Sequence, residues 1–336
     1  METSDSLLVL AEVRGQKIHQ VTFELLAWGR KLAGRRPMTL GCAVLGAGPE
    51  AADPEELDEL IYRGADRVLA VKTAGPPPYP ANLLAGHLVR LIREEKPAIV
   101  IAAATTSGRT LLPIAAARLG TGLTADCTEL AIDPADGLLL QTRPAIGGNV
   151  LATIKTPVAR PQMATVRPRT IKPAERDPGR RGEIISKTFD LSPESASEKI
   201  LHFARREDEK TNLEDAEIVV VGGKGMESKE NFRLLEELAA LLEAGLGATR
   251  DAVEAGWAPF ERQVGLTGKT VSPKVYIGAG VSGKIQHLAG MITSGYIIAI
   301  NKDPEAQLFQ VADLGIIGDA PATVTKLTAA LKKSKS

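Results

Sequence analysis

The chain has 336 residues, a length that favours two domains over one. Hydrophobic residues make up 44% of it but aromatic residues only 4%, so a globular core must be built from Ala, Leu, Ile and Val. The 41 basic residues balance the 41 acidic ones, which argues against a global field that attracts nucleic acid, and two cysteines far apart in sequence argue against a zinc or iron–sulfur site.

The amino-terminal segment contains acidic residues and lacks the basic start of a secretory signal, and it does not resemble a transit peptide. The longest apolar run, residues 98–104, is far too short to cross a bilayer. Two free thiols, Cys42 and Cys127, are typical of a reducing compartment. Together these features predict a cytoplasmic protein with no direct membrane insertion.

Strand-like and helix-like segments alternate over the first 130 residues. Apolar runs predict strands at residues 7–13, 39–45, 67–71 and 98–104. Amphipathic patterns predict helices at residues 21–32, 53–62, 81–95 and 111–119. Strands that are apolar throughout and separated by helices indicate a parallel sheet covered on both faces, so the first half is expected to be an α/β domain.

The stretch Thr105-Thr106-Ser107-Gly108-Arg109 lies where a strand is predicted to end and a helix to begin. Ligands of open α/β sheets bind at this end of the strands, so one interpretation is a phosphate-binding turn. The other interpretation, which we favour, is a simple helix N-cap formed by Thr or Ser.

Between residues 128 and 189 the pattern changes to short strands, with a hairpin turn predicted at Gly147-Gly148-Asn149. Residues 155–187 hold nine Lys or Arg, three acidic residues and five prolines. This segment is either a basic surface that faces a partner or a solvated, proline-stiffened edge segment, and the second interpretation is favoured.

A charged segment without apolar periodicity, residues 207–215, predicts a linker. It separates an N-terminal domain, residues 1–206, from a second α/β domain, residues 216–332, which is expected to be doubly wound. Apolar runs of the second domain predict strands at residues 216–221, 276–277 and 297–300.

Glycine-rich turns of the second domain, at residues 222–225 and 278–283, each follow a predicted strand. Unpaired backbone N–H groups at such turns bind phosphate well, and glycine lets a ligand approach the backbone. The sequence GAGVSG lacks the GxGxxG order followed by an acidic residue about 20 positions on, and the chain has no GxxxxGK[ST] loop at this turn, which argues against ATP hydrolysis.

Gln286 and His287 are predicted to lie in the first turn of the helix after GAGVSG. These side chains are a poor choice for packing alone, and they would sit beside unpaired backbone donors. Further polar residues flank turns of the same domain, namely Arg250, Thr267, Ser282 and Asn301. We therefore expect a polar, anionic ligand against this turn.

The same stretch, GVSGKIQHLAG followed by IIAINKDPEAQLFQVADLGIIGD, resembles the signature of the electron transfer flavoprotein α subunit family. The resemblance continues through ATRDAVEAGW and QVGLTGKTV back to VVVGGKGMESKENFRLLEEL, and it covers about residues 205–330. The first 200 residues resemble the family in architecture and in weaker motifs such as LAEVRG. That first domain is expected to be a nucleotide-hydrolase-like α/β domain.

The resemblance implies one subunit of a heterodimer, whose second domain binds FAD and whose first domain pairs with a β subunit that holds AMP or FAD. Such a protein carries electrons between flavoprotein dehydrogenases, including acyl-CoA dehydrogenases, and a quinone oxidoreductase or ferredoxin-linked acceptor, and is a carrier rather than an enzyme. Two alternatives stay open. One is a subunit of an NADH-oxidising, electron-bifurcating complex, and the other is an NAD-binding enzyme with a sirtuin-like or deoxyhypusine-synthase-like domain.

The resemblance also implies a set of cofactor-binding residues, with no metal ligand and no catalytic residue among them. These are Lys224, Thr249, Arg250, Val264, Gly265, Leu266, Thr267, Gly280, Val281, Ser282, Gly283, Lys284, Ile285, Gln286, His287, Asn301 and Asp319.

Individual roles follow from the same resemblance. Thr267 would lie near flavin N5, His287 would donate a hydrogen bond to flavin O2, and Arg250 would add positive charge that raises the flavin potential. Asn301 and Asp319 would hold the adenosine end. The sequence departs from the family pattern at Lys224, where Arg is usual, and at Leu266, where many members have Gln.

Overall fold

The computed structural model describes residues 4–15, 17–46, 53–73, 77–145, 150–189, 200–202 and 213–335. The chain forms two compact units, and the main division between them falls between residues 204 and 205. The predicted hairpin turn at Gly147-Gly148-Asn149 and residues 207–212 of the predicted linker lie outside the described residues. Among the described residues, no helix is both long and apolar enough to span a membrane.

The first unit is built on a seven-stranded sheet in the order β12-β5-β4-β1-β6-β11-β7, in which all neighbouring strands are parallel. The strands are β1 (Ser4–Leu10), β4 (Thr39–Leu45), β5 (Arg67–Lys72), β6 (Pro97–Ala103), β7 (Leu123–Cys127), β11 (Gln162–Val166) and β12 (Glu183–Thr188). A small antiparallel sheet contains β8 (Glu129–Ile132), β9 (Leu139–Pro144) and β10 (Leu151–Ile154), and β2 (Val13–Arg14) pairs with β3 (Lys17–Ile18).

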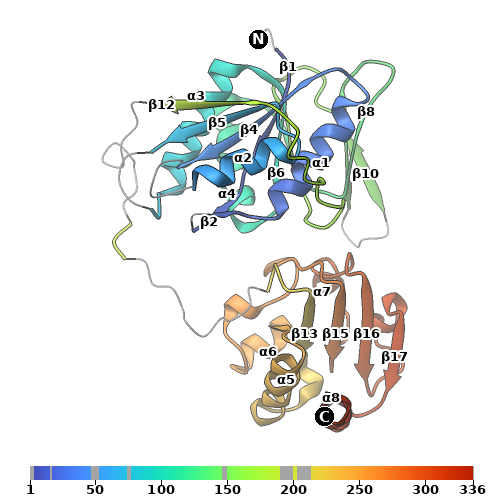
Figure 1. Cartoon of the computed structure of the whole chain (residues 1–336). Helices are drawn as coiled ribbons and strands as arrows, with labels where there is room; N and C mark the ends of the chain where they lie inside the picture. Colours follow the sequence, from blue (N-terminus) through green and yellow to red (C-terminus); the bar gives the residue numbers. More distant parts are fainter. Residues whose placement is uncertain are drawn as a thin grey trace. The chain divides into compact units, whose positions relative to one another are not determined.

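Helices cover both faces of the seven-stranded sheet (Figure 1). They are α1 (Val21–Ala33), α2 (Pro54–Tyr62), α3 (Ala81–Glu95) and α4 (Thr106–Leu119). Apolar side chains of α1 and α2 are buried in one core, and those of α3 and α4 in a second core on the opposite face. This arrangement confirms the predicted α/β domain with a parallel sheet.

Three details of the first unit differ from the expectation. The first strand is Ser4–Leu10 rather than residues 7–13, and β7 was not predicted. The basic segment 155–187 is not a solvated edge throughout, because β11 within it lies between β6 and β7 with all of its residues buried. Of the two strands in this segment, β12 occupies an edge of the sheet and β11 does not.

The turn after β6 is a helix N-cap, the interpretation that was favoured. The hydroxyl oxygen of Thr105 accepts a hydrogen bond from the backbone N–H of Gly108 at 3.3 Å, at the start of α4. The same hydroxyl donates to the buried carboxylate of Glu12, two residues after the end of β1. A carboxylate at this position disfavours phosphate, because two anions would share one turn.

The second unit contains a parallel five-stranded sheet in the order β14-β13-β15-β16-β17. Its strands are β13 (Ile218–Gly222), β14 (Gly245–Ala248), β15 (Val275–Ala279), β16 (Tyr296–Asn301) and β17 (Leu314–Ile317). Its helices are η2 (Lys224–Met226), α5 (Lys229–Leu241), α6 (Arg250–Glu254), η3 (Phe260–Arg262), α7 (Ile285–Leu288), η4 (Gln307–Val311) and α8 (Ala320–Lys335). Numbered along the chain, the strand order is 2-1-3-4-5, a doubly wound arrangement with a change of winding direction between β13 and β15.

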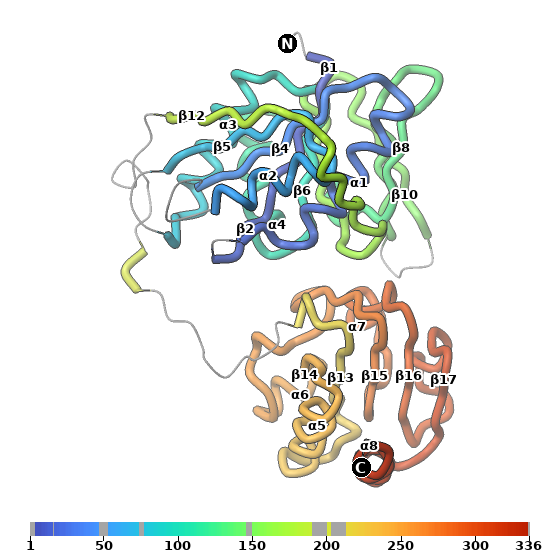
Figure 2. Tube along the Cα trace, in the orientation of Figure 1, coloured from blue at the N-terminus to red at the C-terminus, as the bar shows by residue number. Residues whose placement is uncertain are grey.

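Two long helices, α5 and α8, pack side by side on one face of this sheet (Figure 2). Ser228 caps α5, since its hydroxyl accepts a hydrogen bond from the backbone N–H of Asn231 at 3.1 Å. The helix buries Phe232, Leu235 and Leu238 against the sheet, as the periodicity predicts. On the other face, Leu288 of α7 and Leu308 of η4 pack in a second core with side chains of β13 and β15.

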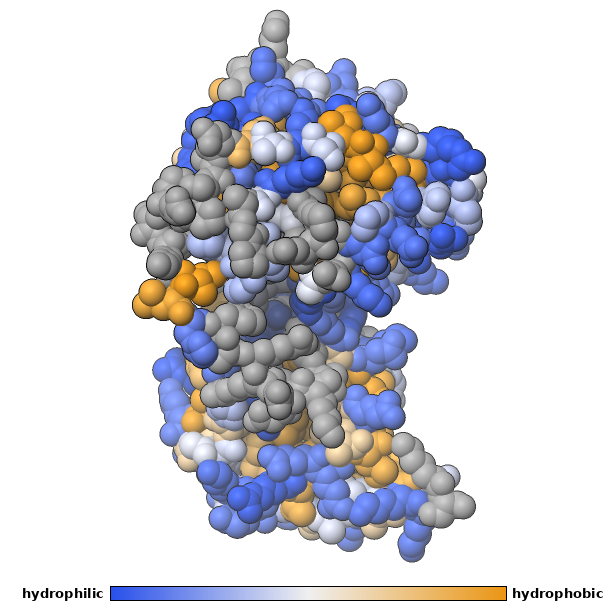
Figure 3. Space-filling model, turned by 60° about the vertical axis from the view of Figure 1, so that its left-hand side comes forward, coloured by the Kyte–Doolittle hydropathy of each residue, from blue (hydrophilic) through white to orange (hydrophobic). Residues whose placement is uncertain are grey.

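The faces of the two units seen in Figure 3 are predominantly polar, with apolar side chains in small groups. Both thiols, Cys42 and Cys127, are free and buried in the first unit. Neither is therefore available for chemistry at the surface.

Candidate functional site

A pocket of about 650 Å³ lies at the carboxyl ends of four strands of the second unit. The segments that follow β13, β14, β15 and β16 all contribute to its lining. The winding direction changes between β13 and β15, which are neighbours in the sheet, and ligands of such sheets bind outside the carboxyl ends of the strands at this point. The volume is in the range of sites that bind small molecules and cofactors.

Glycine permits a very close contact between the loops after β13 and β15. The backbone N–H of Gly225 donates to the carbonyl of Gly280 at 2.9 Å. A Cβ atom on Gly223 would lie 2.2 Å from that carbonyl oxygen, and Gly280 has a φ of +64°. Side chains at these positions would push the two loops apart, so the glycines keep backbone groups at the floor of the pocket.

The pocket brings together all but two of the residues that the sequence predicted for a cofactor. Ile285 does not line it, and neither does Asp319, whose carboxylate accepts a hydrogen bond from the backbone N–H of Ala322 at the start of α8. Six lining residues were not predicted, namely Gly223, Gly225, Asp251, Glu254, Gln263 and Asp303. The two glycines belong to a turn that the sequence did indicate, but the polar side chains gave no signal of their own.

Thr249 carries a buried hydroxyl that has no hydrogen-bond partner among the described residues. It occupies the N-cap position of α6 and lines the pocket, yet its side chain does not cap the helix. A buried hydroxyl without a partner costs about 1–3 kcal/mol. A ligand with polar groups in this pocket would remove that cost, so the side chain fits a bound cofactor.

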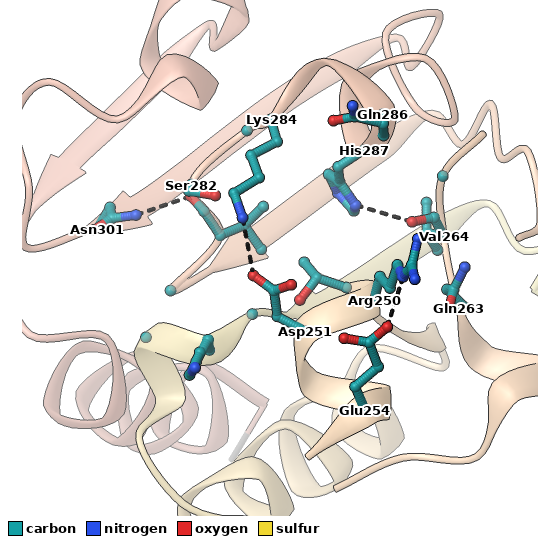
Figure 4. A pocket seen from close by; sticks show the side chains of 18 of the residues that line it. Arg250, Asp251, Glu254, Gln263, Val264, Ser282, Lys284, Gln286, His287 and Asn301 are labelled. Atoms are coloured by element: carbon teal, nitrogen blue, oxygen red, sulfur yellow. Dashed lines mark hydrogen bonds and ion pairs between the residues drawn. The ribbon is translucent and has the colours of Figure 1, made fainter. Parts of the chain in front are cut away.

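Charged side chains at the pocket are paired with one another (Figure 4). Arg250 Nε donates to Glu254 Oε1 at 2.7 Å, one helical turn away, and Lys284 Nζ lies 3.4 Å from Asp251 Oδ2. Both pairs are largely exposed, so each contributes little to stability. Lys224, in contrast, forms no ion pair within the described part of the chain.

His287 differs from its predicted role as a donor to the flavin. Its side chain is only 7% exposed, and both ring nitrogens are already bound within the fold. Nδ1 lies 3.0 Å from the carbonyl oxygen of Val264, and Nε2 lies 2.7 Å from the hydroxyl of Tyr276. The helix α7 is only four residues long. The backbone N–H of His287 donates to the carbonyl of Lys284, whereas the N–H groups of Ile285 and Gln286 in the same turn have no recorded acceptor among the described residues, as the sequence predicted.

Burial lowers the pKa of His287 to about 4, although its hydrogen bond to the Val264 carbonyl raises that pKa in part. The imidazole is therefore neutral at pH 7. A carbonyl oxygen can only accept, so Nδ1 carries the proton and Nε2 accepts from the hydroxyl of Tyr276. No N–H of the ring remains for a ligand in this arrangement.

Two further polar side chains fix the loops around the pocket. The Nδ2 group of Asn301 donates to the carbonyl of Val281 at 2.9 Å, and its Oδ1 accepts from the backbone N–H of Asp303 at 3.0 Å. Gln263 Nε2 donates to the hydroxyl oxygen of Thr267 at 2.9 Å. Asn301 thus ties the end of β16 to the loop after β15, and Gln263 ties together the loop from Val264 to Thr267.

A parallel sheet of order 2-1-3-4-5, glycine turns at the change of winding direction and an unpaired buried hydroxyl together define a nucleotide-cofactor-binding α/β domain. Comparison with known protein families finds a match in each of the two units. The family described as "Electron transfer flavoprotein domain" matches residues 7–192, and that described as "Electron transfer flavoprotein FAD-binding domain" matches residues 212–292.

Full-length relatives agree with these matches. The electron transfer flavoprotein subunit alpha of Thermoanaerobacterium thermosaccharolyticum is 44% identical over 335 residues, covering 100% of both chains. The subunit alpha of Megasphaera elsdenii is 42% identical and covers 98% of this chain and 97% of its own length. The protein FixB of Clostridium saccharobutylicum is 42% identical and covers 97% of this chain and 96% of its own length.

The chain therefore belongs to the electron transfer flavoprotein α subunit family, and its second unit contains the FAD-binding domain of that family. The resemblance found in the sequence is confirmed. These matches give no specific support to the electron-bifurcating alternative.

Proposed function

We propose that the pocket at the carboxyl ends of β13, β14, β15 and β16 holds the FAD on which this subunit carries electrons. The observation that carries this proposal is the pocket itself, in which glycine turns and the unpaired hydroxyl of Thr249 meet at the change of winding direction. Bound FAD supplies one-electron and two-electron chemistry, and the chain binds and orients it.

The charges of the pocket support a division of roles among its residues. Lys224 and Lys284 offer positive charge for the diphosphate of FAD, next to the backbone groups of the glycine turns. Arg250 remains the candidate for a positive charge at the flavin ring, but its pairing with Glu254 reduces the charge that it offers. His287 has a different role from the one predicted, since it positions the loop that begins at Val264.

Asn301 is the candidate for the adenosine end, although its side chain also holds two loops together. Asp319 caps α8 and does not line the pocket. We therefore propose that it lies near the adenosine end without contacting it. Ile285 does not line the pocket, so we propose no contact between its side chain and FAD.

We further propose that the chain works as an electron carrier and not as a free-standing enzyme. Its partner is an electron transfer flavoprotein β subunit, which pairs with the first unit and holds AMP or FAD. Flavoprotein dehydrogenases such as acyl-CoA dehydrogenases would supply the electrons, and a quinone oxidoreductase or a ferredoxin-linked acceptor would receive them. The two free thiols are consistent with a cytoplasmic location.

Co-expression with the β subunit, followed by purification and counting of flavins per heterodimer, tests the proposal. We expect one FAD per heterodimer to depend on the second unit of this chain. We also expect an acyl-CoA dehydrogenase, supplied with its substrate, to reduce that FAD. Loss of the FAD on Thr249→Val, with retention on Thr170→Val in the first unit, would support the location of the site. A heterodimer that retains its full FAD content with bulky side chains at Gly223 and Gly283 would contradict it.

A further inference from the structure

Gln263 directly precedes the loop from Val264 to Thr267, which forms one wall of the pocket, and it lines the pocket itself. Its side chain is 4% exposed, whereas Thr267, four residues later, is exposed at the pocket. The two side chains are joined by the hydrogen bond of 2.9 Å in which Gln263 Nε2 donates to Thr267 Oγ1. The buried amide of Gln263 therefore donates its hydrogen bond to an exposed hydroxyl.

The backbone holds Gln263 firmly in place. Its N–H donates to the carbonyl of Phe260 at 2.8 Å, and its carbonyl accepts from the N–H of Lys269 at 2.7 Å. Gln263 also forms a bridge with Ala248 at the end of β14, and a Cβ atom on Gly268 would lie 2.3 Å from the Gln263 carbonyl oxygen. The amide therefore approaches Thr267 from a fixed direction.

This direction determines which way the hydroxyl of Thr267 points. A hydroxyl has one proton to donate and two lone pairs that accept. The N–H of Gln263 occupies a lone pair, so the hydroxyl proton must turn away from the amide. Among the described residues no acceptor is recorded for that proton, and Thr267 lines the pocket.

We propose that Gln263 is a positioning residue, which orients the Thr267 hydroxyl as a hydrogen-bond donor toward an acceptor atom of the bound flavin. The inference rests on the proposed function of the pocket. It also explains why an amide, and not a carboxylate, occupies position 263, since a carboxylate would accept the hydroxyl proton and leave only a lone pair for the ligand.

The test uses the FAD-loaded heterodimer and the variants Gln263→Leu, Gln263→Glu, Thr267→Val and the double variant Gln263→Leu/Thr267→Val. The readouts are the dissociation constant of FAD, the midpoint potential of the flavin and its visible absorption spectrum. We expect Thr267→Val and Gln263→Leu each to weaken FAD binding about 3- to 10-fold, the loss of one hydrogen bond. Gln263→Glu should weaken it more than Gln263→Leu.

The double variant decides whether Gln263 acts through Thr267. We expect the double variant to bind FAD no more weakly than Thr267→Val alone, with the same flavin potential and absorption spectrum. The reason is that the hydroxyl that Gln263 orients is absent in both variants. Gln286→Leu is a matched control, since Gln286 lines the same pocket without a recorded bond to Thr267, and its effect should add to that of Thr267→Val.

Independent effects of Gln263→Leu and Thr267→Val, or a Gln263→Glu variant with the FAD affinity and potential of the wild type, would overturn the inference. A wild-type heterodimer that binds no FAD in this pocket would instead overturn the proposed function. Circular dichroism of each variant confirms that it is folded, and Gln263→Glu keeps the shape of the side chain if Gln263→Leu fails to fold.

Discussion

The hydroxyl of Tyr276 lies 2.7 Å from Nε2 of His287, and the pair joins the centre of the sheet to the wall of the pocket. Tyr276 is fully buried on β15, and His287 carries the connection to the carbonyl of Val264. The position of the loop from Val264 to Thr267 therefore depends on a side chain that does not itself line the pocket.

Tyr276→Phe removes the hydroxyl and leaves Nε2 of His287 buried without a donor. We expect the free energy of unfolding of the second unit to fall by about 1–3 kcal/mol, the usual cost of one unsatisfied buried polar group. Urea unfolding followed by the fluorescence of Trp257, in a Trp28→Phe background that silences the first unit, measures this change.

Tyr296→Phe is the matched control, because Tyr296 lies on the neighbouring strand β16 with 44% of its surface exposed. It should change the free energy of unfolding by less than about 0.5 kcal/mol. Equal effects of the two substitutions on the free energy of unfolding would show that the buried hydrogen bond to His287 does not stabilise the second unit.

The buried imidazole of His287 predicts acid sensitivity of the second unit. Burial lowers its pKa from 6.5 to about 4 in the folded chain, so the unfolded chain binds more protons between these values. The stability that comes from the neutral imidazole is complete above about pH 6.5, is lost as the pH falls, and levels off below about pH 4. The loss amounts to about 3 kcal/mol.

His287→Gln removes this titration, so the difference in unfolding free energy between pH 7 and pH 4.5 should be smaller in the variant than in the wild type. Urea unfolding at both pH values measures the difference. The exposed His202 provides the control, and His202→Gln should retain the acid sensitivity of the wild type. An unchanged pH dependence in His287→Gln would argue that the imidazole titrates normally.

The ion pair between Arg250 and Glu254 predicts opposite changes of the flavin potential in two variants. Arg250→Ala should lower the potential while FAD stays bound, because positive charge stabilises the reduced flavin. Glu254→Gln should raise it, because the guanidinium is then unpaired. Spectroelectrochemical titration measures both, and Arg250→Lys, which keeps the charge, should stay close to the wild type. Equal potentials in all three variants would remove Arg250 from this role.

The position of the whole pocket within the second unit predicts that this unit binds FAD without the first. A fragment from Asp215 to Ser336 contains every residue that lines the pocket. We expect it to fold and to bind FAD, though more weakly than the heterodimer, in a fluorescence titration. A folded fragment that leaves flavin fluorescence unchanged would show that residues outside this unit complete the site.

Much of the fold was predictable because its elements have strong local patterns. The strands β4 and β6 of the first unit are almost entirely apolar, and Asp53 and Ser228 cap the helices that follow them. The pattern failed at β11, where Gln162 and Thr165 suggest exposure although both are buried. Their polar groups bond to backbone N–H groups of Leu139 and Asp126, contacts that join distant segments and leave no local pattern.

The candidate site was predictable where backbone conformation demands particular residues, as in the glycine turns. It was not predictable where a side chain bonds across the fold. The sequence indicated a polar His287, but only the structure shows that Tyr276 and Val264 occupy both of its nitrogens. Asp251 was missed for a similar reason, since its carboxylate meets Lys284 from another loop.

The walls of the pocket come from strand ends that are as far apart in sequence as Gly223 and Asn301. No smaller piece of the second unit can therefore bind the cofactor, and every molecule of FAD held there opposes unfolding of the entire sheet. At a free FAD concentration 100 times the dissociation constant, this opposition is about 2.7 kcal/mol. A higher concentration of free FAD is therefore expected to slow proteolysis of the subunit, because it lowers the unfolded fraction that proteases cleave.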